Sequence, residues 1–401
     1  MPGFELFSDK ERQEVNEVLD SGVLMRYGFD GIRNGHWKAL ALEKTLAERM
    51  EVRYAQVVSS GTAALTIALA SAGIGAGDEV IMPNFTFVAS FESILALGAV
   101  PILVDIDDTL TLDPQAVQKA ITKRTKAIMP VHMCGSMADL KALKSICQNH
   151  GLLLLEDACQ AIGGTFEGKP LGSYGDMGCF SFDYVKTVTC GEGGAIITNN
   201  EEYYTNADHY SDHGHDHVGK DRGAEGHPFL GYNFRISELH AAVGLAQIRR
   251  LDDFLAIQKK NYLILRETLE NIPEITFRRV PQGGEESYAF LSFFLPSAKI
   301  TKEVHAVLGE NGIDGCFYWF DNNWHYYRKW EHFLHKTSLG KLPKEVFEQL
   351  PNYSKSDFSQ SDGWISRNIS CLIKLGWSES EVRHRALKMA EIIGDLLKRN
   401  Q

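Results

Sequence analysis

Residues 79–105 read EVIMPNFTFVASFESILALGAVPILVD. This stretch holds an apolar, strand-like run at Glu79–Met82 and a helical pattern at Ala89–Leu97 that stops at Gly98. A second apolar run follows at Val100–Asp105. Strands that alternate with helices indicate a mainly parallel sheet covered by helices on both faces. The stretch therefore predicts an α/β fold.

The same alternation continues on both sides of this stretch. Further strands are expected at Gln56–Ser59, Ala127–His132 and Leu152–Asp157, and helices at Thr62–Ala72, Pro114–Ala120 and Ala138–Asn149. These strands are short and apolar, and several end in polar residues. Open α/β sheets bind ligands at the carboxyl ends of their strands. We therefore expect the functional groups at that edge of the sheet.

Beyond Asp157 the regular alternation of strands and helices ends. Short strands at Cys179–Phe182 and Ala195–Thr198 are expected in and after the glycine-dense region 163–194. A long helix is predicted from Ser237 to about Glu270, and beyond it a strand at Tyr288–Leu295 and helices at Thr301–Glu310 and Glu379–Lys398. We expect a large domain of residues 1–250, with an N-terminal arm, and a smaller α+β domain of residues 251–401.

The composition excludes several classes of protein. The 401 residues are 44% hydrophobic and 23% charged, which is typical of a globular protein and not of a disordered one. The formal net charge is −11, so no basic surplus is present to neutralise nucleic acid. The seven scattered cysteines favour reduced thiols in the cytoplasm over a disulfide framework.

Neither targeting nor membrane insertion is expected. Residues Met1–Lys10 are polar and lack the apolar core of a secretory signal. The uncharged stretch Tyr54–Gly77 is too polar at its head to predict a membrane span. The sequence therefore predicts a cytoplasmic protein.

Three motifs carry chemistry, and each has an alternative structural interpretation. Ser59-Ser60-Gly61-Thr62 precedes a helix and suits a phosphate, although it also suits a plain helix cap. Asp157 ends an apolar strand, where it can pair with a protonated ring nitrogen or cap the next helix. Lys186 lies among Phe182, Tyr184 and Val185, which favour partial burial and a nucleophilic amine over a solvated surface group.

A fourth motif, GYNFRISE at residues 231–238, opens the long predicted helix. Ser237 can cap that helix, and Asn233 and Arg235 would lie at its start, where polar groups suit a phosphate.

Taken together, these segments resemble the DegT/StrS-type sugar aminotransferases. These are pyridoxal-phosphate (PLP) enzymes with the aspartate-aminotransferase fold, fold type I. The resemblance extends over nearly the whole chain, and its segments are SSGTAAL, GDEVIMPNFTFVAS, PILVDID, EDACQA, GDMGCFSFDYVK, GEGGAIITN and GYNFRISELHAAVG. It implies a seven-stranded, mainly parallel sheet in the large domain.

The resemblance also implies a role for individual residues around the PLP ring. Lys186 matches the lysine that binds the cofactor covalently, and Asp157 matches the acid that pairs with the pyridine nitrogen. Gln160 matches the group near the phenolic oxygen, and Phe87 matches the aromatic residue that stacks on the ring. Family members that dehydrate their substrate carry His at the position of Lys186, so the lysine favours amino transfer.

The phosphate of PLP has its own set of matching residues. Gly61, Thr62 and Ser181 match phosphate ligands of the same chain, and Asn233 matches a ligand donated by the neighbouring subunit. The resemblance therefore implies a homodimer with shared active sites. The expected amino donor is L-glutamate, which becomes 2-oxoglutarate, and no metal is expected.

Two segments depart from the usual family pattern and bear on the substrate. They are the aromatic loop Leu24–Asp30 and the run CFYWFDNNWHYYRKWEHFLH at Cys316–His335. Both resemble those of aminotransferases that form 8-amino-3,8-dideoxy-D-manno-octulosonate, a lipopolysaccharide sugar, by aminating the C8 aldehyde of oxidised Kdo. A sugar acid needs a cationic or polar partner. The candidate substrate-binding residues are Arg26, Tyr27, His325 and Arg328.

Several alternatives stay open at this point. The acceptor is otherwise a nucleotide-linked keto-hexose, and a non-catalytic PLP-fold sensor is a different class. A histidine cluster at His209, His213, His215 and His217 has spacing that can hold zinc, which would suit a metal-dependent hydrolase. That third class would leave Lys186 and the glycine-rich segment after it without a role. The aromatic run at Cys316–His335 is otherwise a surface helix with core aromatics.

Overall fold

A computed structural model describes residues 2–219 and 222–400 of the chain. Its main feature is a sheet in which the described part of the chain supplies seven strands. In spatial order these are β1 (Tyr54–Val58), β9 (Gly194–Thr198), β8 (Met177–Ser181), β5 (Leu153–Asp157), β4 (Thr125–Ile128), β2 (Glu79–Pro83) and β3 (Val100–Val104). Strand β9 is antiparallel to both of its neighbours, and the other six strands all run in the same direction. The mainly parallel seven-stranded sheet is therefore confirmed.

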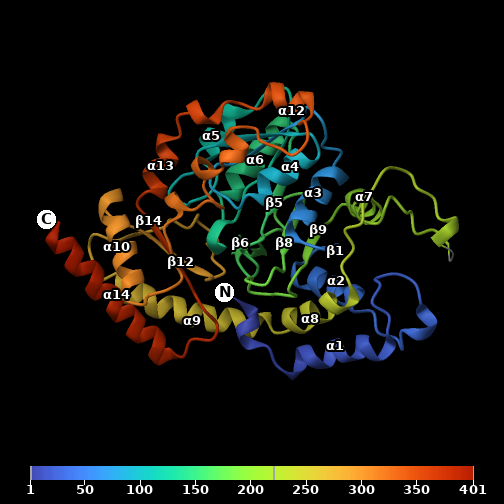
Figure 1. The fold of residues 1–401 in the computed structure, drawn as a ribbon, viewed down its shortest axis with the longest axis horizontal. Coiled ribbons are helices and arrows are strands. Elements are labelled where there is room, and N and C mark those ends of the chain that lie inside the picture. Colours follow the sequence, from blue (N-terminus) through green and yellow to red (C-terminus); the bar gives the residue numbers. More distant parts are fainter. Residues whose placement is uncertain (1, 220–221, 401) are drawn as a thin grey trace.

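Helices cover both faces of this sheet, which makes three layers (Figure 1). One face packs against α3 (Gly61–Ser71), α4 (Ala89–Ala96) and α7 (Glu201–Ser211), and the other against α2 (Lys38–Arg49), α5 (Pro114–Ala120), α6 (Leu140–His150) and α8 (Glu238–Ile248). Alternate residues of a strand point to opposite faces. Accordingly, Val80 and Met82 of β2 join the core under α3, whereas Ile81 joins the core under α6.

A second, antiparallel sheet lies at one end of the molecule (Figure 1). Its strands are β10 (Thr276–Phe277), β12 (Phe290–Phe294), β14 (Asn368–Leu372) and β13 (Cys316–Phe317), and it packs with α9 (Leu251–Leu269), α10 (Ala298–Glu310) and α14 (Glu379–Arg399) around a separate hydrophobic core. The expected α+β elements are therefore present. A third, small sheet consists of β11 (Gly284–Glu285), β6 (Thr165–Phe166) and β7 (Lys169–Pro170).

Part of the C-terminal region packs on the large sheet instead of on the second one. Residues 319–365 contain the short helices α11 (Glu331–Leu334), α12 (Lys344–Gln349) and α13 (Ser359–Ile365). The buried aromatic residues Tyr326, Tyr327 and Trp330 of this segment belong to the same core as α3 and α4. The segment reaches the edge of the sheet where the ligand site is expected. The division of the chain at residue 250 stays a prediction.

Two predicted elements need correction. The single long helix from Ser237 is in fact two helices, α8 and α9, because Arg250 leaves the helical conformation (φ −106°, ψ 6°). Its guanidinium donates to the Leu6 carbonyl and to Glu11, each at 2.8 Å, which ties the break to the N-terminal segment and α1 (Asp9–Ser21). The strand predicted at Ala127–His132 ends at Ile128, shortly before Pro130, which has no N–H to donate.

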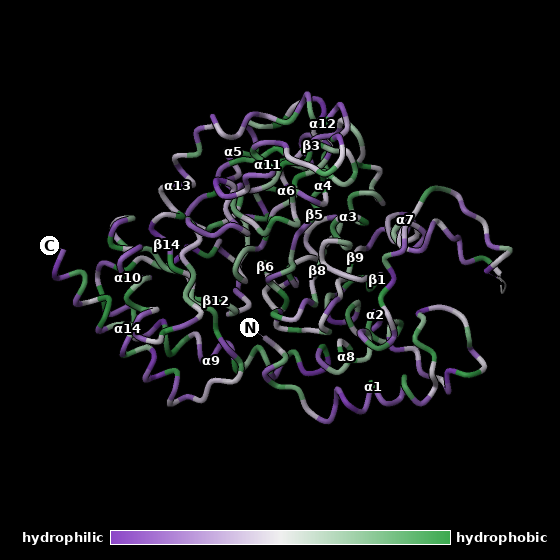
Figure 2. The backbone as a smooth tube through the Cα atoms, in the orientation of Figure 1, coloured by the Kyte–Doolittle hydropathy of each residue, from purple (hydrophilic) through white to green (hydrophobic). Residues whose placement is uncertain are grey.

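The distribution of hydrophobic and hydrophilic residues agrees with this layered fold. The central strands are mainly hydrophobic, whereas the outer turns of α1 and α14 carry hydrophilic residues (Figure 2). Among the described residues, no helix combines the length and apolar character needed to cross a bilayer.

Candidate active site

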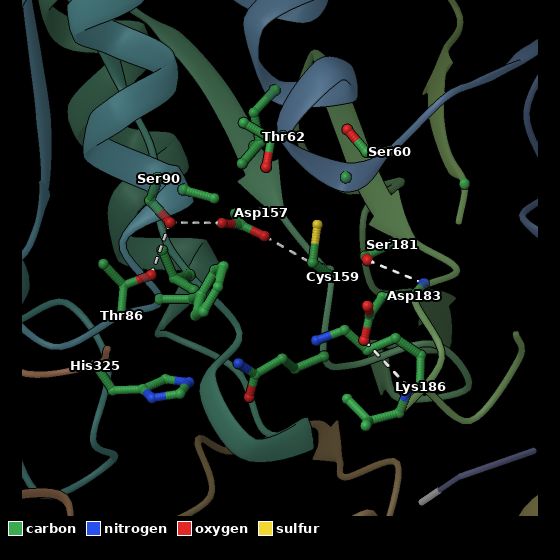
Figure 3. A pocket seen from close by; sticks show the side chains of 18 of the residues that line it. Ser60, Thr62, Thr86, Ser90, Asp157, Cys159, Ser181, Asp183, Lys186 and His325 are labelled. Carbon is green, nitrogen blue, oxygen red and sulfur yellow. Dashed lines mark hydrogen bonds between the residues drawn. The ribbon is translucent and has the colours of Figure 1, made fainter. Parts of the chain in front are cut away.

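A cavity of about 260 Å³ opens at the carboxyl ends of β1, β5 and β8, the sheet edge at which the sequence predicts a ligand site. It brings together residues from as far apart in the chain as Ser60 and His325, because the strands carry different segments to one edge (Figure 3). Of the predicted site residues, the cavity is lined by Gly61, Thr62, Phe87, Asp157, Gln160, Ser181, Lys186 and His325.

One end of the cavity is the N-terminus of α3. Ser60 caps the helix by accepting a hydrogen bond from the Ala63 amide (3.0 Å). The amides of Gly61 and Thr62 lie in the first turn, where the helix supplies no acceptor. A Cβ on Gly61 would lie 2.7 Å from Ser181 Cβ, and one on Gly194 would lie 2.3 Å from the Ser60 carbonyl oxygen. Glycine at both positions keeps the helix end close to β8 and β9, and this end suits an anion.

The opposite wall holds Asp157, a buried carboxylate at the end of β5. Its Oδ2 accepts a hydrogen bond from Ser90 Oγ (2.8 Å), and its Oδ1 accepts one from the Cys159 amide (3.2 Å). Thr86 Oγ1 lies 2.7 Å from Ser90 Oγ and holds that hydroxyl in place. Within the described residues, Asp157 forms no ion pair. A buried carboxylate without a cation is an acceptor for a cationic N–H of a ligand.

Lys186 projects into the cavity from the loop after β8 (Figure 3). Its amide donates to the Asp183 carbonyl (3.0 Å), and its carbonyl accepts from the Gly3 amide (2.9 Å), so the backbone is fixed on both sides. The neighbours that were expected to bury it behave differently. Phe182 is buried, but Tyr184 and Val185 are half exposed, and Tyr184 stacks on Phe4. The cavity walls, which include Val185 but not Tyr184, partly shield the amine.

Gln160 and Phe87 complete the predicted ring contacts. Gln160 Oε1 accepts from the Cys134 amide (3.1 Å), which leaves its NH₂ group for a ligand oxygen. Phe87 stacks on Trp324 with the ring planes 3° apart and the centroids 5.7 Å apart. An aromatic face therefore lies beside the cavity.

His325 comes from the aromatic segment that the sequence linked to substrate. The Thr86 amide donates to the His325 carbonyl (2.9 Å), and the Val88 amide donates to the Trp324 carbonyl (3.0 Å), so this segment is fastened to the residues after β2. His325 Nδ1 lies 2.9 Å from Asn322 Oδ1. Burial and the positive charge of Lys186 lower the pKa of His325 to about 3. The imidazole is therefore neutral near pH 7 and offers a hydrogen bond, not a positive charge.

The other predicted substrate residues do not line this cavity. Arg26 is buried in an ion pair with Glu43. Tyr27 donates its hydroxyl hydrogen bond to Asp208 (2.9 Å), and Arg328 pairs with Asp362 through Nε (2.5 Å) and Nη2. Within one chain these three side chains do not meet His325 at the cavity, because carboxylates of the same chain engage all three. Their role in substrate binding stays a prediction.

Asn233 is also absent from this cavity. Its side chain is exposed, and with Arg26 and Arg235 it lines a separate shallow pocket on the surface. That placement is compatible with the expected donation to a neighbouring subunit, which stays a prediction.

The sequence interpretation did not single out Thr86 or Ser90. Ser90 is the second residue of α4. Its local sequence does not indicate a contact with Asp157, which follows 67 residues later. The segment GEGGAIITN includes Gly194, but its sequence does not show the approach of Gly194 to Ser60.

Two histidines of the cluster, His215 and His217, lie beside carboxylates. His215 Nδ1 lies 2.9 Å from Glu225 Oε2, and His217 stacks on Tyr27 with the centroids 4.4 Å apart. Among residues 2–219 and 222–400, no three metal-ligating side chains come together in a geometry that could hold an ion.

Comparison with known proteins identifies the family. A family model described as the DegT/DnrJ/EryC1/StrS aminotransferase family matches residues 6–373. The chain belongs to this family. The GDP-perosamine synthase of Vibrio cholerae is 34% identical over 314 residues, which are 78% of this chain and 79% of that protein. The L-glutamine:2-deoxy-scyllo-inosose aminotransferase of Streptomyces kanamyceticus is 36% identical over 319 residues, 76% and 74% of the two chains.

The fold is shared with solved structures of aminotransferases. An aminotransferase from Psychrobacter cryohalolentis superposes with a TM-score of 0.82 at 24% identity, over 98% of both chains. This DegT-family protein therefore has the aspartate-aminotransferase-like fold, fold type I, as expected. It is a PLP-dependent aminotransferase of the sugar-aminotransferase family.

The cavity of this family member fits PLP in three respects. The glycine-lined start of α3 suits the phosphate, and Lys186 offers an amine to the same cavity. The buried Asp157, which has no ion-pair partner among the described residues, suits the protonated pyridine nitrogen. The three groups lie around a single cavity, so one small ligand can touch all of them.

Proposed function

We propose that the protein transfers the amino group of L-glutamate to the C8 aldehyde of 8-oxo-3,8-dideoxy-D-manno-octulosonate. The product would be 8-amino-3,8-dideoxy-D-manno-octulosonate, made in the cytoplasm for lipopolysaccharide. The observation that carries this proposal is the position of the segment Cys316–His335. Its departure from the family pattern motivates the octulosonate, and its hydrogen bonds to residues 86 and 88 bring His325 to the cavity.

In this proposal the cofactor-binding residues have different roles. PLP, when bound, supplies an electron sink for the carbon that loses a proton. Gly61, Thr62 and Ser181 hold the phosphate, and Phe87 packs on the ring face. Asp157 keeps a proton on the ring nitrogen, because its buried carboxylate favours a cationic partner.

Lys186 is the residue proposed to move protons. Its Nζ can reach the interior of the cavity from a fixed backbone, which is the geometry that a general base requires. Gln160 offers its NH₂ to the phenolic oxygen of the cofactor.

His325 has a more limited role than the sequence suggested. Because its imidazole is neutral, it would hydrogen bond to a hydroxyl of the sugar, while the carboxylate needs a cation from elsewhere. Of the described residues that line the cavity, Lys186 is the one cation. We propose a homodimer in which Asn233 and the nearby Arg235, which pairs with Asp212 within the chain, face the neighbouring site.

A nucleotide-linked keto-hexose is the alternative acceptor. The similarity to GDP-perosamine synthase favours it, since the name of that relative refers to a nucleotide-linked amino sugar. A non-catalytic sensor is the competing class, but it would leave the family's catalytic lysine position, Lys186, without a use.

Absorption spectroscopy tests the first half of the proposal. The purified protein with PLP should show the visible band of lysine-bound cofactor, and L-glutamate should convert it to the spectrum of the amine form. Lys186→Ala should lose the lysine-bound band. L-Glutamine is the donor control. A band that no amino donor changes would contradict the enzyme and favour the sensor.

An acceptor panel tests the second half. The amine form is mixed with the octulosonate aldehyde or with GDP- or UDP-linked 4-keto-hexoses, and the return of the lysine-bound band is timed. Faster return with the aldehyde supports the proposal. Efficient return with a nucleotide sugar, and none with the aldehyde, would replace it with the alternative.

A further inference from the structure

Two cysteines face each other across the second sheet. Cys316 on β13 and Cys371 on β14 are register partners, and their Sγ atoms lie 2.9 Å apart. The Leu372 amide donates to the Gly315 carbonyl (2.8 Å) just outside the pair. This pattern marks a non-hydrogen-bonded antiparallel pair, in which opposite Cα atoms are about 4.5 Å apart. Disulfides form across Cα separations of roughly 4.4–6.8 Å, so the backbone can accept a crosslink here.

The surroundings of the two thiols differ. Arg385 Nη2 lies 4.0 Å from Cys316 Sγ, and Asp314 holds that guanidinium through Oδ1 (3.0 Å). The hydrogen bond from Cys371 and the charge of Arg385 lower the pKa of Cys316. The same hydrogen bond, together with burial, raises the pKa of Cys371. Cys316 is partly exposed whereas Cys371 is buried, so Cys316 is the more acidic and the more accessible of the two thiols.

The remaining cysteines lack these features. Four of them are buried and one lines the active-site cavity, and burial raises the pKa of each: Cys134, Cys147, Cys159, Cys179 and Cys190. In the described part of the chain, no other two Sγ atoms lie within hydrogen-bonding distance. A thiol reagent should therefore select the pair on the second sheet.

We propose that Cys316 and Cys371 are a modification site at which a low-molecular-weight disulfide, such as oxidised glutathione, introduces a reversible intramolecular disulfide. The Cys316 thiolate attacks one sulfur of the reagent, whose S–S bond breaks and releases a thiolate. Cys371 then gives its proton to solvent and attacks Cys316 Sγ, and the second reagent thiolate leaves. The two protein thiols are oxidised, and one reagent disulfide is reduced to two thiols.

Cys316 is the first residue of the segment Cys316–His335, which reaches the active site. Phe317 stacks on Trp319 (centroids 4.7 Å apart), and Trp319 in turn contacts His325 (4.6 Å). The disulfide would join the start of this segment to β14. The proposal concerns the thiols alone and does not depend on the identity of the acceptor.

Peptide mapping tests the proposal directly. Full-length protein with bound PLP is incubated with oxidised glutathione, alkylated in denaturant and analysed by mass spectrometry. Before alkylation we expect an intact mass lower by about 2 Da and two fewer titratable thiols. After alkylation the protein should carry five alkyl groups instead of seven, and a peptide should link Cys316 to Cys371. Dithiothreitol should restore all seven thiols, and the cofactor spectrum should stay unchanged, which shows that the fold is intact.

Two variants control the experiment. Cys316→Ser should form no linked peptide, whereas Cys147→Ser, which changes a buried cysteine of α6, should crosslink like the wild type. Three outcomes would overturn the proposal: a glutathione adduct that persists on Cys316 while Cys371 stays titratable, a link that involves another cysteine, or seven unreacted thiols.

Discussion

At the scale of single residues, Asp157 is the group whose charge matters most. It is buried without a cation among the described residues, and two donors, Ser90 Oγ and the Cys159 amide, hold its orientation. We predict that Asp157→Asn still binds PLP but reacts with L-glutamate at least about 100-fold more slowly, the scale of losing one preorganised electrostatic contact. Stopped-flow spectroscopy of the cofactor band measures this rate.

A substitution of Ser90 also tests the Asp157 carboxylate, with a smaller expected loss of rate. Ser90→Ala removes one hydrogen bond to the carboxylate, which should slow the reaction by roughly 10-fold, since a hydrogen bond to a charged group contributes about 1.5–3 kcal/mol. Ser93→Ala is the matched control, because its hydroxyl is buried in the same helix but bonds only to the Ser90 carbonyl. An equal loss in both variants would argue against a specific role for Ser90.

His325 should make the cofactor-free protein sensitive to acid. Its pKa in the folded state is about 3, below its ordinary value near 6.5. Between these values the unfolded chain binds more protons, so the free energy of unfolding falls as the pH drops from about 6.5. The slope from one residue is at most about 1.4 kcal/mol per pH unit.

Urea denaturation at pH 7 and pH 5 checks this prediction. His325→Gln should lose less stability between the two pH values than the wild type does. His384→Gln, which changes an exposed histidine of α14, serves as the control. If His325→Gln and the wild type show the same difference, the imidazole is not held neutral.

At the scale of elements, the packing between α3 and β9 positions the proposed phosphate site. A Cβ at Gly194 would lie 2.3 Å from the Ser60 carbonyl oxygen and 2.7 Å from the Gly61 nitrogen. Gly194→Ala must therefore push the start of α3 away from β9. We predict a loss of about 1–3 kcal/mol in stability and at least 10-fold weaker binding of PLP.

Gly309→Ala is the matched control for this change. Gly309 lies in α10, and no atom lies within 4 Å of the position that its methyl group would take, so alanine should be neutral or stabilise the helix by up to about 1 kcal/mol. Thermal melts and fluorescence titration with PLP separate the two effects. Normal PLP affinity in Gly194→Ala would show that the close approach does not shape the site.

The order of strands and helices in the large domain could be predicted because the pattern is local. Short apolar runs, Gly73 and Gly98 as helix stops and Asp113 as an N-cap are all signals within a few residues. The break between α8 and α9 could not be predicted, since it depends on Arg250 reaching Leu6 and Glu11 more than 230 positions earlier.

For the candidate site, too, local features could be predicted from the sequence and contacts between distant segments could not. The cofactor residues fall in local motifs at strand ends, and the topology brings them together. Within one chain Arg26 and Arg328 do not line the cavity, which the sequence could not show, because a free arginine and one paired with Glu43 or Asp362 look the same in a sequence. The support of Asp157 by Ser90 is a contact between distant segments and has no local signal.

At the scale of the whole molecule, two loops project on the same side (Figure 1). Both carry exposed apolar residues. Phe29 and Ile32 of one loop are each 57% exposed, and Leu230 of the other is 91% exposed, close to the exposed Asn233. Apolar side chains gathered at a protruding edge are typical of a protein interface. They support the proposed homodimer, which sedimentation equilibrium can test.

Subunit mixing tests whether the active sites are shared. If Asn233 serves the neighbouring site, Lys186→Ala and Asn233→Ala are each inactive, but a mixed dimer contains one site with both residues intact. Random reassociation makes half of the dimers mixed, so about a quarter of the wild-type activity should return. Lys186→Ala mixed with Asp157→Asn should recover nothing, because both residues line the cavity of one chain. Failure of the first pair to recover activity would place Asn233 outside the neighbouring site, since the mixed dimer then offers no better site than its parents.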